Sequence, residues 1–168
     1  MDPHVDLLTQ IEAQYMLKNL AYNNAASMTY RKFGTVAYIL RLTDKMSRYE
    51  NLLEHADINN GDESIDDTLR DAINYLFMLV GDLITQCKEP SDSRNIKETL
   101  SQIRYIAKME YYEVQLDADR FEERWLSQNG KLSDVPYRLF VEDDGTVFNY
   151  LDFAEYLIVL YIERRENQ

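Results

Sequence analysis

The sequence is poor in cysteine, glycine and proline. Its 168 residues include one cysteine, Cys87, five glycines and three prolines. A single cysteine excludes a disulfide within the chain, so we expect a reducing compartment, the cytoplasm. Because glycine and proline interrupt helices, their scarcity favours long helices over a fold with many turns. These absences predict a mainly α-helical protein.

A long apolar run is also absent. The best candidate, residues 156–162, is far shorter than the ~18 residues that a membrane-spanning helix needs. Residues 1–4 lack the basic start that a signal peptide requires. We therefore expect no signal peptide and no membrane location.

Basic residues are few beside the acidic ones. Eighteen lysines and arginines stand against 30 aspartates and glutamates, and the formal net charge is −12 at pH 7. Such a charge repels a phosphate backbone, which argues against direct nucleic-acid binding. Metal binding, docking on a basic partner and plain solubility all stay open.

Apolar residues recur at helical spacing over most of the chain. We expect helices over residues 5–17, 31–54, 61–86, 94–128 and 150–165, with 94–128 forming either one helix or two with a bend. Between the first two helices, the asparagines of residues 18–24 favour a turn or an irregular segment.

The C-terminal part has a different pattern. Residues 138–149 place apolar segments on both sides of a turn-like Asp-Asp-Gly sequence at 143–145, which predicts a small β-hairpin. Asn149 is then the expected cap of the last helix. We take residues 1–90 as a helical core and 91–168 as a helical extension packed on it in one compact unit.

The helix expected at 61–86 carries an acidic stripe. Glu63, Asp67, Asp71 and Asn74 lie within about 80° of one another on a helical wheel. A solvated face is one interpretation, but like charges four residues apart cost roughly 0.2–0.5 kcal/mol per pair. A divalent cation between the carboxylates would reverse that cost, and Mg²⁺ prefers such oxygen ligands. Spacing alone leaves both interpretations open.

The preceding helix carries a basic stripe. Arg41, Lys45 and Arg48 lie on one side of it, with Asp44 at the edge. These residues suit phosphate oxygens. They equally suit salt bridges to the acidic stripe or a solvated face, and spacing does not separate these alternatives.

The segment Lys18–Tyr22 adds donors and an aromatic ring. Tyr22 could stack on a base and Asn19 could read its edge, although a helix end with local caps is the commoner meaning of such a stretch.

Three sequence motifs occur in order within residues 12–80. They are Lys18-Asn19-x-x-Tyr22, then Arg41-x-x-Asp44-Lys45-x-x-Arg48, then Glu63-Ser-Ile-Asp66-Asp67-Thr-Leu-Arg-Asp71-Ala-Ile-Asn74-Tyr75. Together they resemble the nucleotide-modification-associated domain 1 family, which is common in phages and bacteria. The resemblance implies kinship with the all-α nucleoside triphosphate pyrophosphatases of the MazG and dimeric dUTPase group. That group usually carries E-x-x-E before E-x-x-D, and here Glu63 and Asp66 fit only the second motif, loosely.

The resemblance implies a Mg²⁺-dependent pyrophosphohydrolase, with Mn²⁺ as the alternative ion. It would cleave a nucleoside triphosphate to a monophosphate and pyrophosphate, and would act as a dimer or higher homo-oligomer. The implied metal ligands are Glu63, Asp67, Asp71 and Asp44, and the implied catalytic groups are Glu63, Asp67, Asp71 and Lys45. The implied substrate-binding residues are Lys18, Asn19, Tyr22, Arg41, Arg48, Asn74 and Tyr75. The alternative is a non-catalytic acidic protein that sequesters a nucleotide or inhibits a basic, nucleic-acid-binding partner.

Overall fold

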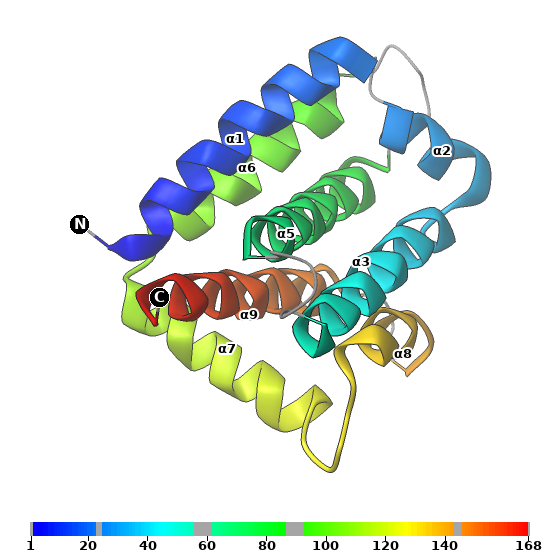
Figure 1. The fold of residues 1–168 in the computed structure, drawn as a ribbon. Helices are drawn as coiled ribbons and strands as arrows, with labels where there is room; N and C mark the ends of the chain where they lie inside the picture. The colour runs from blue at the N-terminus through cyan, green and yellow to red at the C-terminus, as the bar shows by residue number, and fades with distance from the viewer. Residues whose placement is uncertain (1, 23–24, 56–61, 87–92, 143–145, 168) are drawn as a thin grey trace.

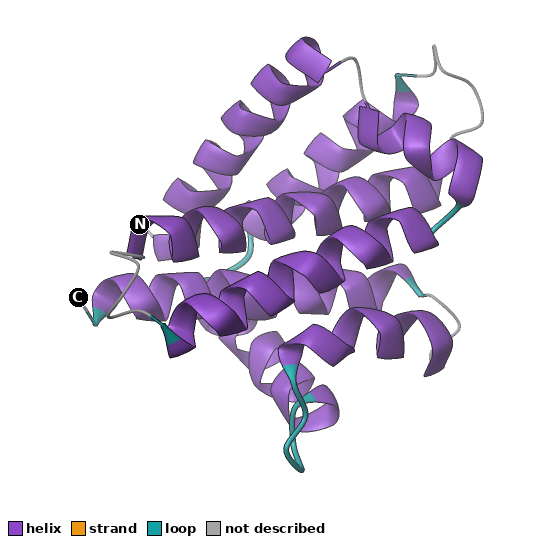
Figure 2. Cartoon of the chain, turned by 45° about the vertical axis from the view of Figure 1, so that its right-hand side comes forward, coloured by secondary structure: helices purple, strands orange, loops and turns teal. Residues whose placement is uncertain are grey.

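The computed structural model describes residues 2–22, 25–55, 62–86, 93–142 and 146–167, and the side chains of all of these except 20–22 and 62–64. In these ranges the regular structure is entirely helical and no strand occurs (Figure 2). The helices are α1 (Pro3–Tyr22), α2 (Ala25–Phe33), α3 (Val36–Glu54), α5 (Asp62–Thr85), α6 (Arg94–Ala107), α7 (Tyr111–Trp125), the short η1 (Leu132–Asp134), α8 (Val135–Glu142) and α9 (Val147–Glu166).

Helix α5 is the centre of the fold. It packs against α3, α6 and α9, which surround it in Figure 1. Its apolar side is fully buried, as at Leu69, Leu76 and Phe77. Gly81 lets α6 approach closely, because a Cβ at this position would collide with the side chain of Thr99. The acidic stripe of α5 instead faces α1 and α3, where Asp71 contacts Lys18 and Lys45.

The other helices cover this central group. Helix α1 lies beside α6, α7 packs on α9, and η1 and α8 pack on α3 (Figure 1). His4 ties the start of α1 to the junction of α6 and α7, since its Nε2 donates to the carbonyl of Ile106 at 3.0 Å and its ring stacks on Tyr111. One cluster of buried apolar residues extends from Leu7 to Ile162.

The predicted β-hairpin is wrong. Residues 138–142 belong to α8 and residues 147–149 to α9, while 143–145 lie outside the described residues. Burial explains the helix, because Val135 and Leu139, four residues apart, are buried while Phe140 and Val141 stay partly exposed. Asn149 is not the cap either. Thr146 precedes α9, and Asn149 lies inside it.

Other helix limits also differ from those expected from the sequence. The helix expected at 31–54 is divided into α2 and α3 at Gly34, whose φ of 75° is left-handed. The segment 94–128 forms two helices, which is one of the two alternatives expected for it. Residues 18–22 continue α1 instead of forming a turn. In the part of the chain that the structure describes, no helix is apolar and long enough to span a membrane.

Candidate functional site

The acidic and basic stripes meet where α3 and α5 pack. Contacts between the polar sides of these helices include three that run in register. Arg41 lies over the Tyr75 ring at 5.6 Å, Lys45 Nζ is 3.0 Å from Asp71 Oδ2, and Arg48 Nε donates to Thr68 Oγ1 at 3.3 Å. Residue numbers rise along α3 as they fall along α5, so the helices are antiparallel. The two stripes therefore meet at Lys45 and Asp71.

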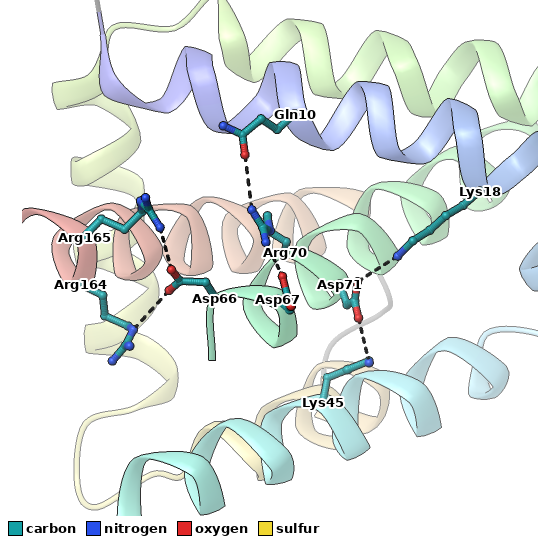
Figure 3. Close-up of polar contacts among 9 residues, drawn as sticks. All are labelled: Gln10, Lys18, Lys45, Asp66, Asp67, Arg70, Asp71, Arg164 and Arg165. Atoms are coloured by element: carbon teal, nitrogen blue, oxygen red, sulfur yellow. Dashed lines mark hydrogen bonds and ion pairs between the residues drawn. The ribbon is translucent and has the colours of Figure 1, made fainter. Parts of the chain in front are cut away.

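Asp71 is the charged centre of this contact. Lys18 Nζ from α1 lies 3.1 Å from Asp71 Oδ1, and Lys45 from α3 approaches the other oxygen (Figure 3). All three side chains keep partial access to solvent. The basic stripe therefore forms an interhelical salt bridge at Lys45. Lys18 adds a second cation, which the spacing of residues within α3 and α5 could not predict because Lys18 lies on α1.

A pocket of about 290 Å³ opens beside Asp71. Its walls come from α1, α2, α3 and α5, and its lining residues are Tyr15, Lys18, Asn19, Ala25, Ala26, Arg41, Asp71, Asn74, Tyr75 and Met78. Six predicted site residues are therefore gathered in one cavity: Lys18, Asn19, Arg41, Asp71, Asn74 and Tyr75. Cations and an acid share it with apolar and aromatic surface, which is the usual composition of a small-molecule site.

Asn74 offers an unused acceptor to this pocket. Its side chain is only 9% exposed, and its Oδ1 is buried without a hydrogen-bond partner. Buried amide oxygens are nearly always hydrogen-bonded in folded proteins. The free acceptor at a pocket wall therefore favours a ligand that carries an N–H or O–H donor.

A second hollow of about 360 Å³ adjoins the first. Asp67 and Asp71 both line it, together with Gln14, Leu17, Lys18 and Arg70. Asp67 pairs with Arg70 and its side chain is 58% exposed, while Arg70 also donates to Gln10 Oε1 at 3.4 Å (Figure 3). The two hollows share Lys18 and Asp71, so a ligand could extend from one to the other.

Some predicted site residues lie elsewhere. Asp44 and Arg48 line a separate groove with His55. The side chains of Glu63 and Tyr22 are outside the described residues, so their roles stay predictions. Among the described side chains, Asp44, Asp67 and Asp71 do not form a group of converging ligand atoms.

Asp66 has a structural environment. It is buried on the side of α5 that faces α9, where Arg165 Nη1 lies 2.8 Å and Arg164 Nε 3.8 Å from its carboxylate (Figure 3). The residue that loosely fits the second carboxylate of an E-x-x-D motif thus joins α5 to α9. It does not reach the pocket beside Asp71.

A buried polar network joins three of the helices that line the pocket, α2, α3 and α5, to one another and to α6. Asp82 accepts hydrogen bonds from Tyr38 at 2.6 Å and Ser27 at 2.9 Å, and Asn95 donates to Ser27 at 2.7 Å. Burial raises the pKa of Asp82, although the hydroxyl donors and Arg31 act in the opposite direction. This network fixes α2, α3 and α6 to α5. On a helical wheel Asp82 continues the side of α5 that carries the acidic stripe, yet it is fully buried.

A third group of acids was missed by the sequence analysis. Asp117 on α7 and Asp152 and Glu155 on α9 lie close together, outside the motifs discussed above. A signal was present, because Asp152 and Glu155 interrupt an otherwise apolar segment at a spacing of three residues. Their approach to Asp117 depends on the packing of α7 on α9, which the sequence does not reveal.

Comparisons of the chain with protein-family models, with curated proteins and with solved structures found no match.

Proposed function

We propose that the protein is a Mg²⁺-dependent pyrophosphohydrolase of the MazG-like type, acting on a nucleoside triphosphate. The observation that supports this most is the pocket beside Asp71. It combines cationic, amide and aromatic side chains from three of the sequence motifs in one cavity. A nucleotide needs the same combination: donors for phosphate, a polar group for the base and a flat surface beside it.

The nucleoside would occupy the apolar part of the pocket. Tyr75 and Tyr15 supply aromatic surface, and the free Oδ1 of Asn74 would accept a hydrogen bond from the base or the sugar. Asn19 is the second amide in the lining. A buried acceptor that is satisfied only by ligand selects strongly for a donor at that point.

The phosphates would lie toward Lys18, Arg41 and Lys45. In the described structure Lys18 and Lys45 both pair with Asp71. Partly exposed ion pairs contribute at most about 1 kcal/mol each, so a polyphosphate can compete for these lysines. Arg41 already lies over the Tyr75 ring. In this position it would bind phosphate oxygens without first breaking an ion pair with a carboxylate of the described residues.

The acidic residues fit Mg²⁺ by their chemistry. Asp67 and Asp71 are carboxylates one helical turn apart that line the same hollow, and Mg²⁺ takes one or two protein carboxylates together with water and substrate phosphate. Asp67 and Asp71 would hold the ion, with Glu63 as a further candidate. When bound, the ion neutralises phosphate charge. The lysines and Arg41 orient the polyphosphate and stabilise charge that develops on its oxygens.

The test is a panel of nucleoside triphosphates incubated with Mg²⁺, with pyrophosphate and phosphate release followed separately. We expect pyrophosphate release for at least one nucleotide, and a loss of at least tenfold in kcat/KM for Lys45→Met. The matched control is Lys131→Met, which changes an exposed lysine outside the site. Phosphate release alone, or equal activity in the two variants, would contradict the proposal.

The metal part has its own test. Asp67→Asn should raise the Mg²⁺ concentration that gives half-maximal turnover, because it removes one carboxylate from the hollow. Nucleotide binding without turnover in the wild type, measured by calorimetry, would leave sequestration of a nucleotide as the function. An unchanged Mg²⁺ dependence would remove Asp67 from the ligand set.

A further inference from the structure

The contact between α7 and α9 holds three carboxyl groups. Asp117, Asp152 and Glu155 each place an oxygen within 4.8 Å of the other two. None of them lines either of the hollows beside Asp71. The cluster is therefore a second acidic site, built from the part of the chain that lies beyond the three sequence motifs.

One side-chain oxygen of Glu155 lacks the partner that its burial requires. Its side chain is 4% exposed, and its Oε2 is shielded from solvent without a hydrogen-bond partner. Burying a carboxylate that is not hydrogen-bonded or paired is costly, and such groups in folded proteins are satisfied by protein, water or an ion. The unsatisfied oxygen thus indicates a missing partner at this point, independently of the clustering of the acids.

The cationic side chains nearby do not fill this role. Arg120 Nη1 pairs with Asp117 at 3.1 Å, but the arginine side chain is largely exposed. Glu155 shares a hydrogen bond with Asp117, but this contact joins two acids and brings no positive charge to the cluster.

Space for a ligand is present beside the acids. A cavity of about 330 Å³ is lined by all three carboxyl groups and by Ser101 and Gln102 of α6. Its volume exceeds that of an ion, so water molecules could complete a coordination shell. The cavity connects the cluster to solvent, which provides an entry path.

We propose that Asp117, Asp152 and Glu155 bind a divalent cation such as Ca²⁺ that fastens α7 to α9. Such ions take oxygen ligands from carboxylates and water. The three carboxyl groups, with water in the cavity, would supply these ligands. The ion would also give Glu155 Oε2 the partner that it lacks.

The experiment is a calcium titration of chelator-treated protein, followed by calorimetry and by thermal unfolding. Wild type should bind one Ca²⁺ at this site and unfold at a higher temperature with Ca²⁺ than without it, because a ligand stabilises the state that binds it. Glu155→Gln, which keeps the size of the side chain, should raise the Kd for Ca²⁺ at least tenfold and abolish the thermal shift.

Two controls make the result specific. Asp119→Asn removes an exposed acid from the same helix and should keep the full Ca²⁺ shift. Asp71→Asn should also keep it, which separates this site from the proposed nucleotide site, so either proposal can fail without the other. Asp152→Asn serves as a second ligand variant if Glu155→Gln does not fold.

Two results would overturn the inference. One is a wild type without a Ca²⁺ shift in which Glu155→Gln is simply more stable, since Glu155 then only shares a proton with Asp117. The other is an equal shift in wild type and Glu155→Gln, which would place the bound ion elsewhere.

Discussion

At the residue scale, Asp71 holds the two lysines that a polyphosphate would need. Lys18 and Lys45 each contact one of its oxygens. Under the proposed function, Asp71 would compete with phosphate for these lysines when no metal is bound and would be a ligand when metal is present. The two roles have opposite consequences for affinity, so one substitution can separate them.

We predict that Asp71→Asn changes nucleotide affinity in opposite directions with and without Mg²⁺. In EDTA the variant should bind a non-hydrolysable nucleoside triphosphate severalfold more tightly, because the lysines are released from their acid. With Mg²⁺ it should bind more weakly than wild type and lose turnover. Stability should fall by no more than about 1 kcal/mol, since the pairs are partly exposed. Calorimetric titrations in the two buffers measure this, and a parallel change in both would contradict the dual role.

Asp82 provides a pH-dependent prediction. Burial holds the pKa of Asp82 in the folded protein above 3.8, the ordinary value for an aspartate, so the folded state binds this proton more tightly than the unfolded chain. The stability that follows from this is complete below the unfolded pKa and is lost as pH rises through the folded pKa. We therefore expect the difference in unfolding free energy between wild type and Asp82→Asn to be larger at pH 4 than at pH 7.

Urea denaturation of both proteins at the two pH values measures this difference. Asp119→Asn is the control, because an exposed acid makes no such network. A difference that grows as pH rises would show that the hydroxyl donors, rather than burial, dominate the ionisation of Asp82.

The pocket residues could be foreseen only in part. Residues from the two stripes were expected together because they lie on consecutive helices with apolar opposite faces, and the antiparallel packing brings Arg41 to Tyr75 and Lys45 to Asp71. The role of Lys18 as a partner of Asp71 depends on where α1 docks. Asp82 could not be assigned, because its helical position did not show that Ser27 and Tyr38 would cover it.

At the scale of elements, α5 and α6 approach each other closely at Gly81. A Cβ there would meet Thr99 Oγ1 and would come within 3.0 Å of the carbonyl oxygen of Asn95. Alanine is normally favoured over glycine in a helix by about 1 kcal/mol. Crowding should outweigh this preference, because overpacking a buried contact costs typically 1–3 kcal/mol.

We predict that Gly81→Ala lowers the free energy of unfolding by about 1–2 kcal/mol. Combining it with Thr99→Ala should cost less than the sum of the two single changes, because the second substitution removes the side chain that the new methyl group meets. Chemical denaturation of the four proteins of this double-mutant cycle gives the coupling. A stabilised Gly81→Ala, or strict additivity, would show that the helices separate without cost.

The helices were predictable as elements, whereas their ends depended on contacts between elements. Long amphipathic segments such as 62–85 follow directly from apolar spacing. The hairpin expected at 138–149 failed because local turn chemistry was weighed without knowledge of burial. Arg138 illustrates the missing information, since it donates to the carbonyl of Trp125 at 2.7 Å and lies over the indole ring. These long-range contacts favour the helix.

At the scale of the whole molecule, several large apolar side chains of the described residues are exposed. Two groups of them are Phe33, Val36 and Leu40 on α2 and α3, and Tyr105 and Tyr112 on α6 and α7. Large exposed apolar groups that lie near one another often mark interfaces. The resemblance to MazG-like enzymes led us to expect a homo-oligomer, with the tyrosine-rich 94–128 segment as its surface.

We predict a dimer at micromolar concentration, with its contact at one of these two surfaces. Tyr112→Glu should produce a monomer if the tyrosine-rich surface is the interface, and Phe33→Glu should do so if α2 and α3 form it. Multi-angle light scattering distinguishes the outcomes. Val141→Glu, which changes an exposed apolar residue on α8, is the control. A monomeric wild type would rule out self-association.

The tie between His4 and Ile106 also has a consequence for biosynthesis. These residues are 102 positions apart, so α1 cannot reach its final place until the ribosome has made α6 and the start of α7. Until then Leu7, Leu8 and Ile11, which are buried in the finished protein, lack the cover that α6 and α9 supply. Contacts of such long sequence separation delay folding and leave apolar segments exposed to aggregation. The nascent chain should therefore depend on a chaperone that shields its first helix, and the yield of folded protein should fall when synthesis outpaces that protection.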